Sequence, residues 1–441
     1  MRINYLVTPG VVLAAILGTA NASAASPNIV EQWNKIAEDT VVASGAFQGE
    51  GEVYMAYVSA AVYDAVVAIN GRYKQLGTPV TAPPGASTDA AVIEAAYDTL
   101  VYYFHGSTAA ATLNPLYITA LAAIPDGTAK TNGQAVGLSA ALSIIAMRTG
   151  DGRLTPIGTS SAFLARTPGP GVYRLTPPAY APPQTPWVGS MKPWGLQSPD
   201  QFLPEPPPDL RSDTWANAFA YMRAFGVANS TVRTAEQTAI AEFYSANAIR
   251  QFNLIARDFA DAHGLDVVDT ARLAAMINVV LADAGMAFFR AKYHYLFWRP
   301  VTAIDPASVK ADGFGPVPGY DDGNPSTAEQ SGWRPLLATP NHPEYPSAHC
   351  TFTSAVAEIL SRWLGTNNIN IDVHGFDPAG PPGNLNAVRH FATAADEREE
   401  VSNARIWGGL HYSFSTAAGL RLGRQVANYD LHQLFGLQDQ P

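Results

Sequence analysis

The chain of 441 residues carries 37 acidic and 27 basic side chains, which gives a formal net charge of −10 at pH 7. This acidic balance argues against a nucleic-acid-binding protein, whose electrostatic footprint would be basic. Hydrophobic residues make up 47% of the chain and charged residues only 15%, a composition that supplies a large core and excludes a disordered chain. The single cysteine, Cys350, permits no internal disulfide.

Residues 1–24 have the features of a secretory signal peptide. Arg2 precedes an apolar run at 11–17, and Ala-Ser-Ala at 22–24 forms a small-residue cleavage site. The apolar run is too short to cross roughly 30 Å of hydrocarbon, and a later apolar stretch at 274–298 is interrupted by three charged side chains. We therefore expect an exported protein, periplasmic or extracellular, with no stable membrane insertion. The absence of disulfides suits a bacterial periplasm or medium.

Apolar residues recur at helical spacing up to residue 150, so residues 25–150 are predicted to form an N-terminal helical region. The pattern then stops, and 14 of the 34 prolines fall between residues 151 and 208. Because proline removes an amide donor and blocks helix interiors, residues 151–210 are predicted to be an irregular segment. A loop of this length is more often functional than idle, and we expect it to form one wall of a cleft.

Residues 211–441 are predicted to be a C-terminal helical region that carries the functional site. Helical periodicity returns there over five segments, 214–225, 235–257, 269–298, 347–364 and 416–434. Gly, Pro, Asn and Asp mark loops at 311–346 and 372–384. No alternation typical of strands lasts long enough to predict a sheet, so the predicted fold class is all-α, with two helical bundles and long Pro-rich loops.

The first of three clusters that could hold an oxyanion runs from Lys292 to Arg299-Pro300. Seven residues make two helical turns, so the two cations are expected on one helix face, about 10 Å apart along the axis. The residues between them are mostly aromatic, which indicates a buried helix, and buried cations need an anionic partner. No carboxylate lies between Lys292 and Ile304. The alternative is a solvated basic stripe at a helix end.

The second cluster is Ser347-Ala348-His349, directly after Tyr345-Pro346. Ser347 is placed as the N-cap of a helix, and the free amides of a helix start form an anion site. His349, in the first turn, would stand close enough to a bound anion for proton transfer. The alternative is an ordinary capped helix with a packing histidine.

The third cluster extends from Arg405 to His411. On a continuous helix the two would face different ways, but Gly408-Gly409 favours a turn between them. Ser413 or Ser415 could then cap the next helix, which would place His411 at another helix start. Alone, this spacing is a weak signal that takes its weight from the other two clusters.

In order, the three clusters resemble the signature of the superfamily that joins vanadium-dependent haloperoxidases with type 2 phosphatidic acid phosphatases and bacterial acid phosphatases. Its pattern is Lys, six residues, Arg-Pro, then Pro-Ser-Gly-His, then Ser-Arg, five residues, His. The gaps also fit, with 45 residues between Pro300 and Pro346 and 55 between His349 and Arg405. The helical N-terminal half with its long loop looks like the soluble bacterial haloperoxidase-like members.

The resemblance implies a vanadate cofactor with hydrogen peroxide and a halide as substrates. His411 would be the axial ligand to the metal, His349 the acid–base group that handles the peroxide protons, and Lys292 the group that polarises bound peroxide. The residues implied to bind vanadate are Lys292, Arg299, Ser347, Ala348 through its amide, Arg405 and His411. His342 falls at the position near the halide, where a histidine resembles the bromide-oxidising rather than the chloride-oxidising members. Bromide or iodide is therefore the favoured halide.

The sequence departs from the family pattern at three positions. Ala348 replaces a glycine and would be strained if that position needs a positive φ, and Ala404 replaces the serine before the arginine. Ser415 stands where an aspartate often follows the last histidine, so that carboxylate is not expected to orient His411. Glu242 is a guess for a carboxylate that supports His349.

Two alternatives stay open. In the phosphatase branch of the superfamily, the same residues would hold phosphate, His411 would attack phosphorus and His349 would protonate the leaving alcohol. A relative that binds an oxyanion without turnover is the second alternative.

The sequence is also compatible with a homo-oligomer. We expect structural roles for the other six histidines, which are His105, His263, His294, His374, His390 and His432.

Overall fold

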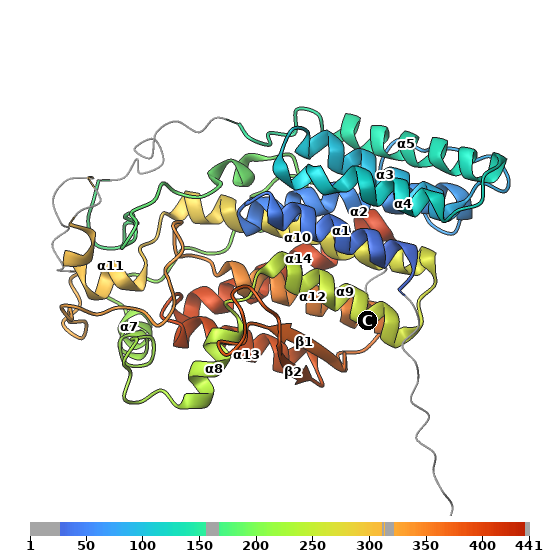
Figure 1. The fold of residues 1–441 in the computed structure, drawn as a ribbon. Helices are drawn as coiled ribbons and strands as arrows, with labels where there is room; N and C mark the ends of the chain where they lie inside the picture. Colours follow the sequence, from blue (N-terminus) through green and yellow to red (C-terminus); the bar gives the residue numbers. More distant parts are fainter. Residues whose placement is uncertain (1–26, 156–166, 311–312, 314–321, 437–441) are drawn as a thin grey trace, which may run out of the picture.

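The computed structural model describes residues 27–155, 167–310, 313 and 322–436. The predicted signal peptide, residues 1–24, lies outside the described residues. Over the described ranges the chain is mainly helical and contains one two-stranded sheet (Figure 1). The predicted all-α fold class is therefore confirmed.

The helices of the N-terminal side lie in layers above α10 in Figure 1, and those that carry the predicted motifs lie below it. The helices are α1 (Ile29–Ala43), α2 (Gln48–Asn70), α3 (Thr88–Phe104), η1 (Thr108–Thr112), α4 (Leu113–Ala122), α5 (Thr128–Arg148), η2 (Pro186–Ser190), α7 (Asp213–Phe225), α8 (Ala235–Phe243), α9 (Ala248–His263), α10 (Val267–Tyr295), α11 (Pro300–Ile304), η3 (Pro306–Val309), α12 (Ala348–Leu364), α13 (Ala394–Trp407) and α14 (Ser413–Phe435). The strands are β1 (Ile371–Gly375) and β2 (Ala387–Phe391).

The long helix α10 is the centre of the molecule. It packs against α2 from the N-terminal region and against α12 and α14 from the C-terminal region, so helices from both sides of the Pro-rich segment share one hydrophobic core. By length and apolarity α2 and α10 could each cross a membrane, but 89% and 94% of their apolar windows are buried inside the protein, as is typical of core helices. The apolar surfaces of α2 and α10 are therefore packed against other helices of the protein.

Two glycines let α14 approach α12 closely at the point where the predicted motifs meet. A Cβ at Gly419 would lie 2.5 Å from the carbonyl oxygen of Ser347, and a Cβ at Gly423 would lie 2.1 Å from that of Thr351. The spacing of four residues puts both glycines on one face of α14. This contact fixes the start of α12 against the start of α14.

Two predicted boundaries were wrong. The segment 235–257 is two helices, because the chain breaks after α8 and Asn247 caps α9 by accepting a hydrogen bond from the Arg250 amide (3.3 Å). The helix expected to reach residue 298 ends at Tyr295, because Leu296 takes a left-handed conformation with φ 51°. This turn changes how the first cluster is built.

The prediction that no sheet forms was also wrong. Strands β1 and β2 make an antiparallel hairpin with Ile371 opposite Phe391, and residues 372–375 of the predicted loop belong to it. Only β1 has a consistently buried face, whereas in β2 only Phe391 is buried and the apolar Val388 is exposed. The alternation is therefore too short to be recognised in the sequence.

The described part of the Pro-rich segment braces the loops that carry the site. Trp298 donates its amide to the Gly171 carbonyl (3.2 Å), Tyr173 donates to Leu296 (2.8 Å), and Gln184 donates to Asn341 (2.9 Å). Pro177 and Pro178 line a separate pocket together with Val301 of α11 and residues 334–339. The described segment supplies no lining residue to the cavity formed by the predicted motifs, so the expected cleft wall belongs to another pocket.

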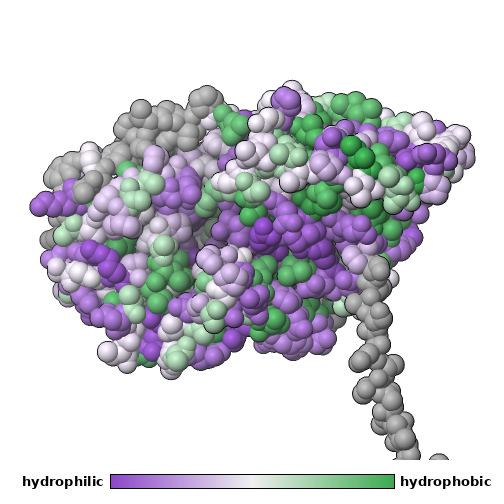
Figure 2. Space-filling view, viewed as in Figure 1, coloured by the Kyte–Doolittle hydropathy of each residue, from purple (hydrophilic) through white to green (hydrophobic). Residues whose placement is uncertain are grey.

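The space-filling view separates two kinds of surface. Hydrophilic residues cover the middle of the molecule over α1 and α9, and apolar residues gather toward the end formed by α3, α4 and α5 (Figure 2). The exposed apolar side chains on α4 and α5 are Leu116, Ile118, Leu138 and Leu142.

Candidate functional site

The second and third sequence clusters line one cavity of about 80 Å³, and Arg299 of the first cluster contacts two histidines that line it, His342 and His411. One side is polar and is formed by His342, His349, Arg405 and His411. The other side is apolar and is formed mainly by four phenylalanines, Phe47, Phe288, Phe289 and Phe352. Phe47 belongs to the N-terminal region, so both halves of the chain build the cavity.

Lys292 lies in the last turn of α10 and is fully buried. Its ammonium group donates to the carbonyl oxygens of Pro343 (3.0 Å), Glu344 (2.9 Å) and Pro346. Burial, followed by the nearby Arg299, holds the pKa of Lys292 well below its usual value. With its three protons directed at one loop, Lys292 both fixes that loop and contributes positive charge.

The prediction that Arg299 and Lys292 share a helix face was wrong. The left-handed Leu296 ends α10 between them. Arg299 is instead the N-cap of α11 and is fully buried. Its Nε donates to the His342 carbonyl (2.9 Å), its Nη2 lies 3.0 Å from His342 Nδ1, and its Nη1 lies 3.3 Å from His411 Nε2. The guanidinium thus touches two of the three predicted histidines.

Ser347 Oγ and Arg405 Nε are among the buried polar atoms that have no hydrogen-bond partner within the described residues. Ser347 is the N-cap of α12, as predicted, but its side chain does not bond to the helix amides. Arg405 is 2% exposed, and one of its amino groups donates to the Tyr244 carbonyl (3.1 Å). Burying an unpaired donor costs free energy, so these atoms indicate a ligand that would satisfy them.

Glu344 is a site residue that the sequence reasoning missed. It is fully buried, and its Oε1 accepts from the Tyr412 amide (3.1 Å) and lies 2.9 Å from His411 Nδ1. It comes from the loop that Lys292 holds, 40 residues after Ile304 in the sequence. Burial raises the pKa of Glu344 to about 7, although Arg299 and Lys292 act in the opposite direction. The sequence feature that could have pointed to Glu344 is its position three residues before Ser347, next to the second cluster.

The three histidines of the cavity are kept neutral. Burial, followed by the neighbouring cations, holds the pKa values of His342, His349 and His411 well below the usual 6.5. His342 is packed between two aromatic rings, 6.0 Å from Phe47 and 5.8 Å from Phe289 between ring centroids. Each histidine therefore offers a lone pair at neutral pH.

The charges of the site do not balance. Lys292, Arg299 and Arg405 are 0–2% exposed, and Glu344 is the one carboxylate that the described residues place among them. Burial lowers the pKa of each arginine to about 10. An excess of buried positive charge is unfavourable unless an anion joins it. The residues therefore fit a compact, multiply charged oxyanion such as vanadate or phosphate.

Helix starts add to this positive potential. The cavity is lined by Ala348 at the start of α12, by Gln48 at the start of α2 and by Ala248 at the start of α9. His411 comes one residue before Tyr412, the N-cap of α14. Free amides at helix starts attract anions, but the Ala248 amide already donates to Gln48 Oε1 (3.0 Å).

The departures from the family pattern have structural outcomes. Ala348 is the first residue of α12 and has no positive φ, so the alanine carries no backbone strain. The prediction that Ser413 or Ser415 caps the last helix was wrong, because the N-cap is Tyr412. Glu242 lies near Arg233 instead, and the described residues place no carboxylate within hydrogen-bond distance of His349. Burial raises the pKa of Cys350 to about 12, which leaves it a packing residue.

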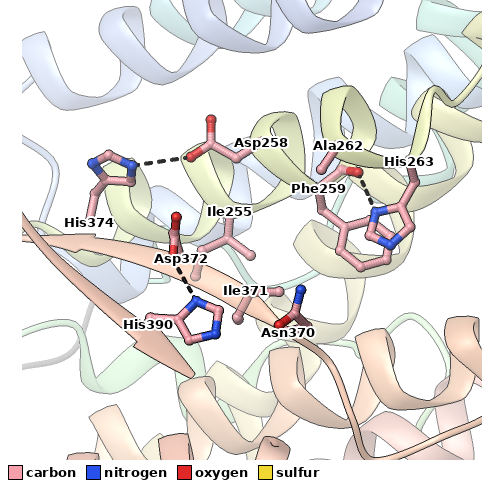
Figure 3. A pocket seen from close by; sticks show the side chains of 10 residues that line it. All are labelled: Ile255, Asp258, Phe259, Ala262, His263, Asn370, Ile371, Asp372, His374 and His390. Atoms are coloured by element: carbon pink, nitrogen blue, oxygen red, sulfur yellow. Dashed lines mark hydrogen bonds and ion pairs between the residues drawn. The ribbon is translucent and has the colours of Figure 1, made fainter. Parts of the chain in front are cut away.

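A larger pocket of about 350 Å³ lies on the outside of the molecule, between α9 and the β1–β2 hairpin (Figure 3). Its histidines have partners: His374 Nε2 lies 3.5 Å from Asp258, His390 Nδ1 lies 2.8 Å from Asp372, and His263 bonds to the carbonyl of Phe259. Among the residues that the structure describes, no group of three or more His, Cys, Asp or Glu side chains is placed to hold a metal ion. The expected structural roles fit these contacts.

Comparisons with known proteins agree with this architecture. A family model described as the second helical-bundle domain of VCPO matches residues 272–437. The chain is 30% identical over 283 residues to the vanadium chloroperoxidase of Curvularia inaequalis, a match that covers 50% of this chain and 44% of that protein. The chain thus spans less than half the length of that relative.

Two solved structures have a similar fold. A bacterial vanadium-dependent iodoperoxidase superposes with a TM-score of 0.74 at 22% identity, covering 94% of this chain and 97% of the other. The holo form of a bacterial vanadium-dependent chloroperoxidase gives a TM-score of 0.64 at 15% identity, covering 90% and 92%. The part of the chain that carries the three motifs thus matches the second helical-bundle domain of VCPO, and the chain shares the fold of these two bacterial vanadium-dependent enzymes.

Proposed function

We propose that the protein is a vanadium-dependent haloperoxidase that oxidises bromide or iodide with hydrogen peroxide. The observation that carries the proposal is His411, which presents Nε2 toward Arg299 in a cavity with excess buried positive charge. Its relatives named above support the same class of activity. Vanadate would supply a Lewis-acidic centre that activates peroxide for two-electron oxidation of the halide.

The residues of the cavity divide the work. Arg299, Arg405, Ser347 and the amide of Ala348 would hold the oxyanion, with His411 Nε2 as the ligand to the metal. Neutral His349 lines the cavity at the start of α12, where it can accept a proton from incoming peroxide. Lys292 would add positive charge behind the loop that it holds, and charge fixed in advance stabilises a developing anion.

The apolar side of the cavity favours a small second substrate. Four phenylalanines and Pro340 face the polar side, and the volume of about 80 Å³ leaves little room beside an oxyanion. Among halides, the larger bromide and iodide lose less hydration free energy than chloride on entering such a space. His342, packed between Phe47 and Phe289, would lie nearest the halide.

The decisive assay loads the purified protein with orthovanadate and measures peroxide consumption with bromide, iodide or chloride. We expect a vanadate-dependent rate with bromide or iodide that is absent from the ligand-free protein. Phosphate-ester hydrolysis without vanadate is measured in parallel. Ester turnover with no vanadate-dependent halide oxidation would contradict the proposal.

Two further expectations from the sequence remain proposals. Residues 1–24 would direct export to the periplasm or the medium, which comparison of the mature N-terminus with the encoded one would test. The exposed apolar side chains of α4 and α5 are a surface on which a homo-oligomer could form, and sedimentation would report its size.

A further inference from the structure

A buried carboxylate lies behind His411 of the 80 Å³ cavity, the inner cavity, in a place where the family pattern does not put one. Ser415 occupies the position four residues after His411 where an aspartate often stands. Glu344, which is 67 residues before His411 in sequence, lies 2.9 Å from its Nδ1. The structure therefore supplies a carboxylate to His411 from another segment of the chain.

The contacts of His411 define which nitrogen carries its proton. An arginine can only donate hydrogen bonds, so Nε2, 3.3 Å from Arg299 Nη1, must offer its lone pair. A carboxylate oxygen accepts hydrogen bonds, and Glu344 Oε1 lies 2.9 Å from Nδ1, so Nδ1 is the donor of this pair. The remaining proton is therefore on Nδ1 and is donated to Glu344 Oε1.

Glu344 is held firmly in the orientation that this bond needs. Its amide donates to the Phe297 carbonyl (2.9 Å), its carbonyl accepts from Lys292 (2.9 Å), and its Oε1 also accepts from the Tyr412 amide (3.1 Å). These contacts join the segments that bear Lys292, Arg299 and His411. One loop thus connects all three sequence clusters.

We propose that Glu344 is the positioning residue of the site: it fixes the tautomer and the ring orientation of His411, so that the Nε2 lone pair faces the bound oxyanion. This inference rests on the proposed function for the identity of the oxyanion. The carboxylate partner of a metal-ligating histidine commonly sets the affinity for the metal by about 10- to 100-fold.

Two explanations of Glu344 predict opposite signs. If it acted only through its charge, removing it would strengthen anion binding, because less negative charge would stand beside the anion. If it positions His411, removing it weakens binding. Glu344→Met removes both the charge and the acceptor, whereas Glu344→Gln removes the charge and keeps an acceptor oxygen.

The experiment measures binding of orthovanadate, and separately of inorganic phosphate, to the ligand-free protein at about pH 8 by calorimetry. We expect E344M to bind vanadate about 10- to 100-fold more weakly than the wild type and E344Q to recover part of that loss. Glu52→Gln is the matched control, because Glu52 is equally buried and has no contact with His411 in the described structure. Its vanadate affinity should stay within about twofold of the wild-type value.

A second measurement needs no variant of Glu344. Imidazole ¹⁵N shifts of the wild-type protein, with His411 assigned by loss of its signal in His411→Gln, should show the proton on Nδ1. A proton on Nε2, or tighter vanadate binding by E344M, would overturn the proposal. If both results are as expected but no halide is oxidised, the proposed function fails and the role of Glu344 stands.

Discussion

The two histidine-containing pockets of this molecule differ in how their charges are paired. In the outer pocket beside the hairpin, His374 and His390 face carboxylates and remain partly exposed to water. Around the inner cavity, Lys292, Arg299 and Arg405 are 0–2% exposed with one carboxylate among them, and the unpartnered polar atoms of the described residues include Ser347 Oγ and Arg405 Nε. The outer pocket is the larger. Buried charge without compensation, rather than volume or histidine content, therefore distinguishes the candidate functional site.

The largest expected effect comes from His411. His411→Ala should reduce vanadate-dependent halide oxidation by about 10³-fold or more, because the ligand to the metal is lost. The matched change in the outer pocket, His374→Ala, should leave the rate within about twofold of the wild type. Initial rates at saturating peroxide compare the two variants. Equal losses in both would remove the distinction between the pockets.

Glu52 tests whether a buried group without a partner is always a sign of function. It lies in α2, fully buried, and burial raises its pKa from 4.5 to about 8. Because the folded-state pKa is the higher one, its contribution to stability is complete below about pH 4.5 and is lost as the pH rises through about 8.

Glu52→Gln should therefore remove part of the pH dependence of stability. We expect the free energy of unfolding of the wild type to fall by about 3 kcal/mol more than that of E52Q between about pH 5 and pH 8. Urea unfolding at both values measures this. Parallel pH profiles would mean that Glu52 ionises without cost in the folded protein.

Unlike Glu52, Arg405 should stay charged at neutral pH, since a guanidinium does not release its proton there. Its removal should therefore affect anion binding rather than the pH dependence of stability. Arg405→Met should weaken vanadate binding by about 10- to 100-fold, the range expected for one charge-assisted hydrogen bond. Without ligand, the variant should unfold at the same temperature as the wild type or higher, because a buried cation is removed. Arg389→Met, which loses surface ion pairs with Glu400 and Glu236, is the control and should bind vanadate normally.

The smallest effect is expected at His390. This residue and its partner Asp372 are 57% and 60% exposed, and exposed ion pairs contribute little to stability. His390→Ala should change the free energy of unfolding by less than about 0.5 kcal/mol and leave vanadate binding unaltered. A larger loss of binding, seen in the same calorimetric assay, would connect the outer pocket to the inner one.

The sequence predicted the helical fold and the members of the cluster because both depend on local patterns. Helical periodicity marks the core helices, and the spacing of Lys292, Arg299, Ser347 and His411 marks the site. It could not predict how Arg299 reaches the cavity. That depends on Leu296, a residue with no intrinsic preference for positive φ, which the packing around α10 holds in a left-handed conformation.

Glu344 was missed for a different reason. Its partner His411 is far away in sequence, and only the close approach of α12 and α14, permitted by Gly419 and Gly423, brings the two segments together. The same holds for Phe47 and Gln48, which come to the cavity from the N-terminal region. Contacts between segments that are distant in sequence can be recognised only once the tertiary structure is known.

Equilibrium dialysis of the wild-type protein against orthovanadate tests the central claim most directly. The buried, uncompensated cations of the inner cavity should hold one oxyanion per chain, displaced by phosphate and lost when Arg299 is replaced by methionine. Retention of that site in R299M, or the absence of saturable binding to the wild type, would contradict the assignment.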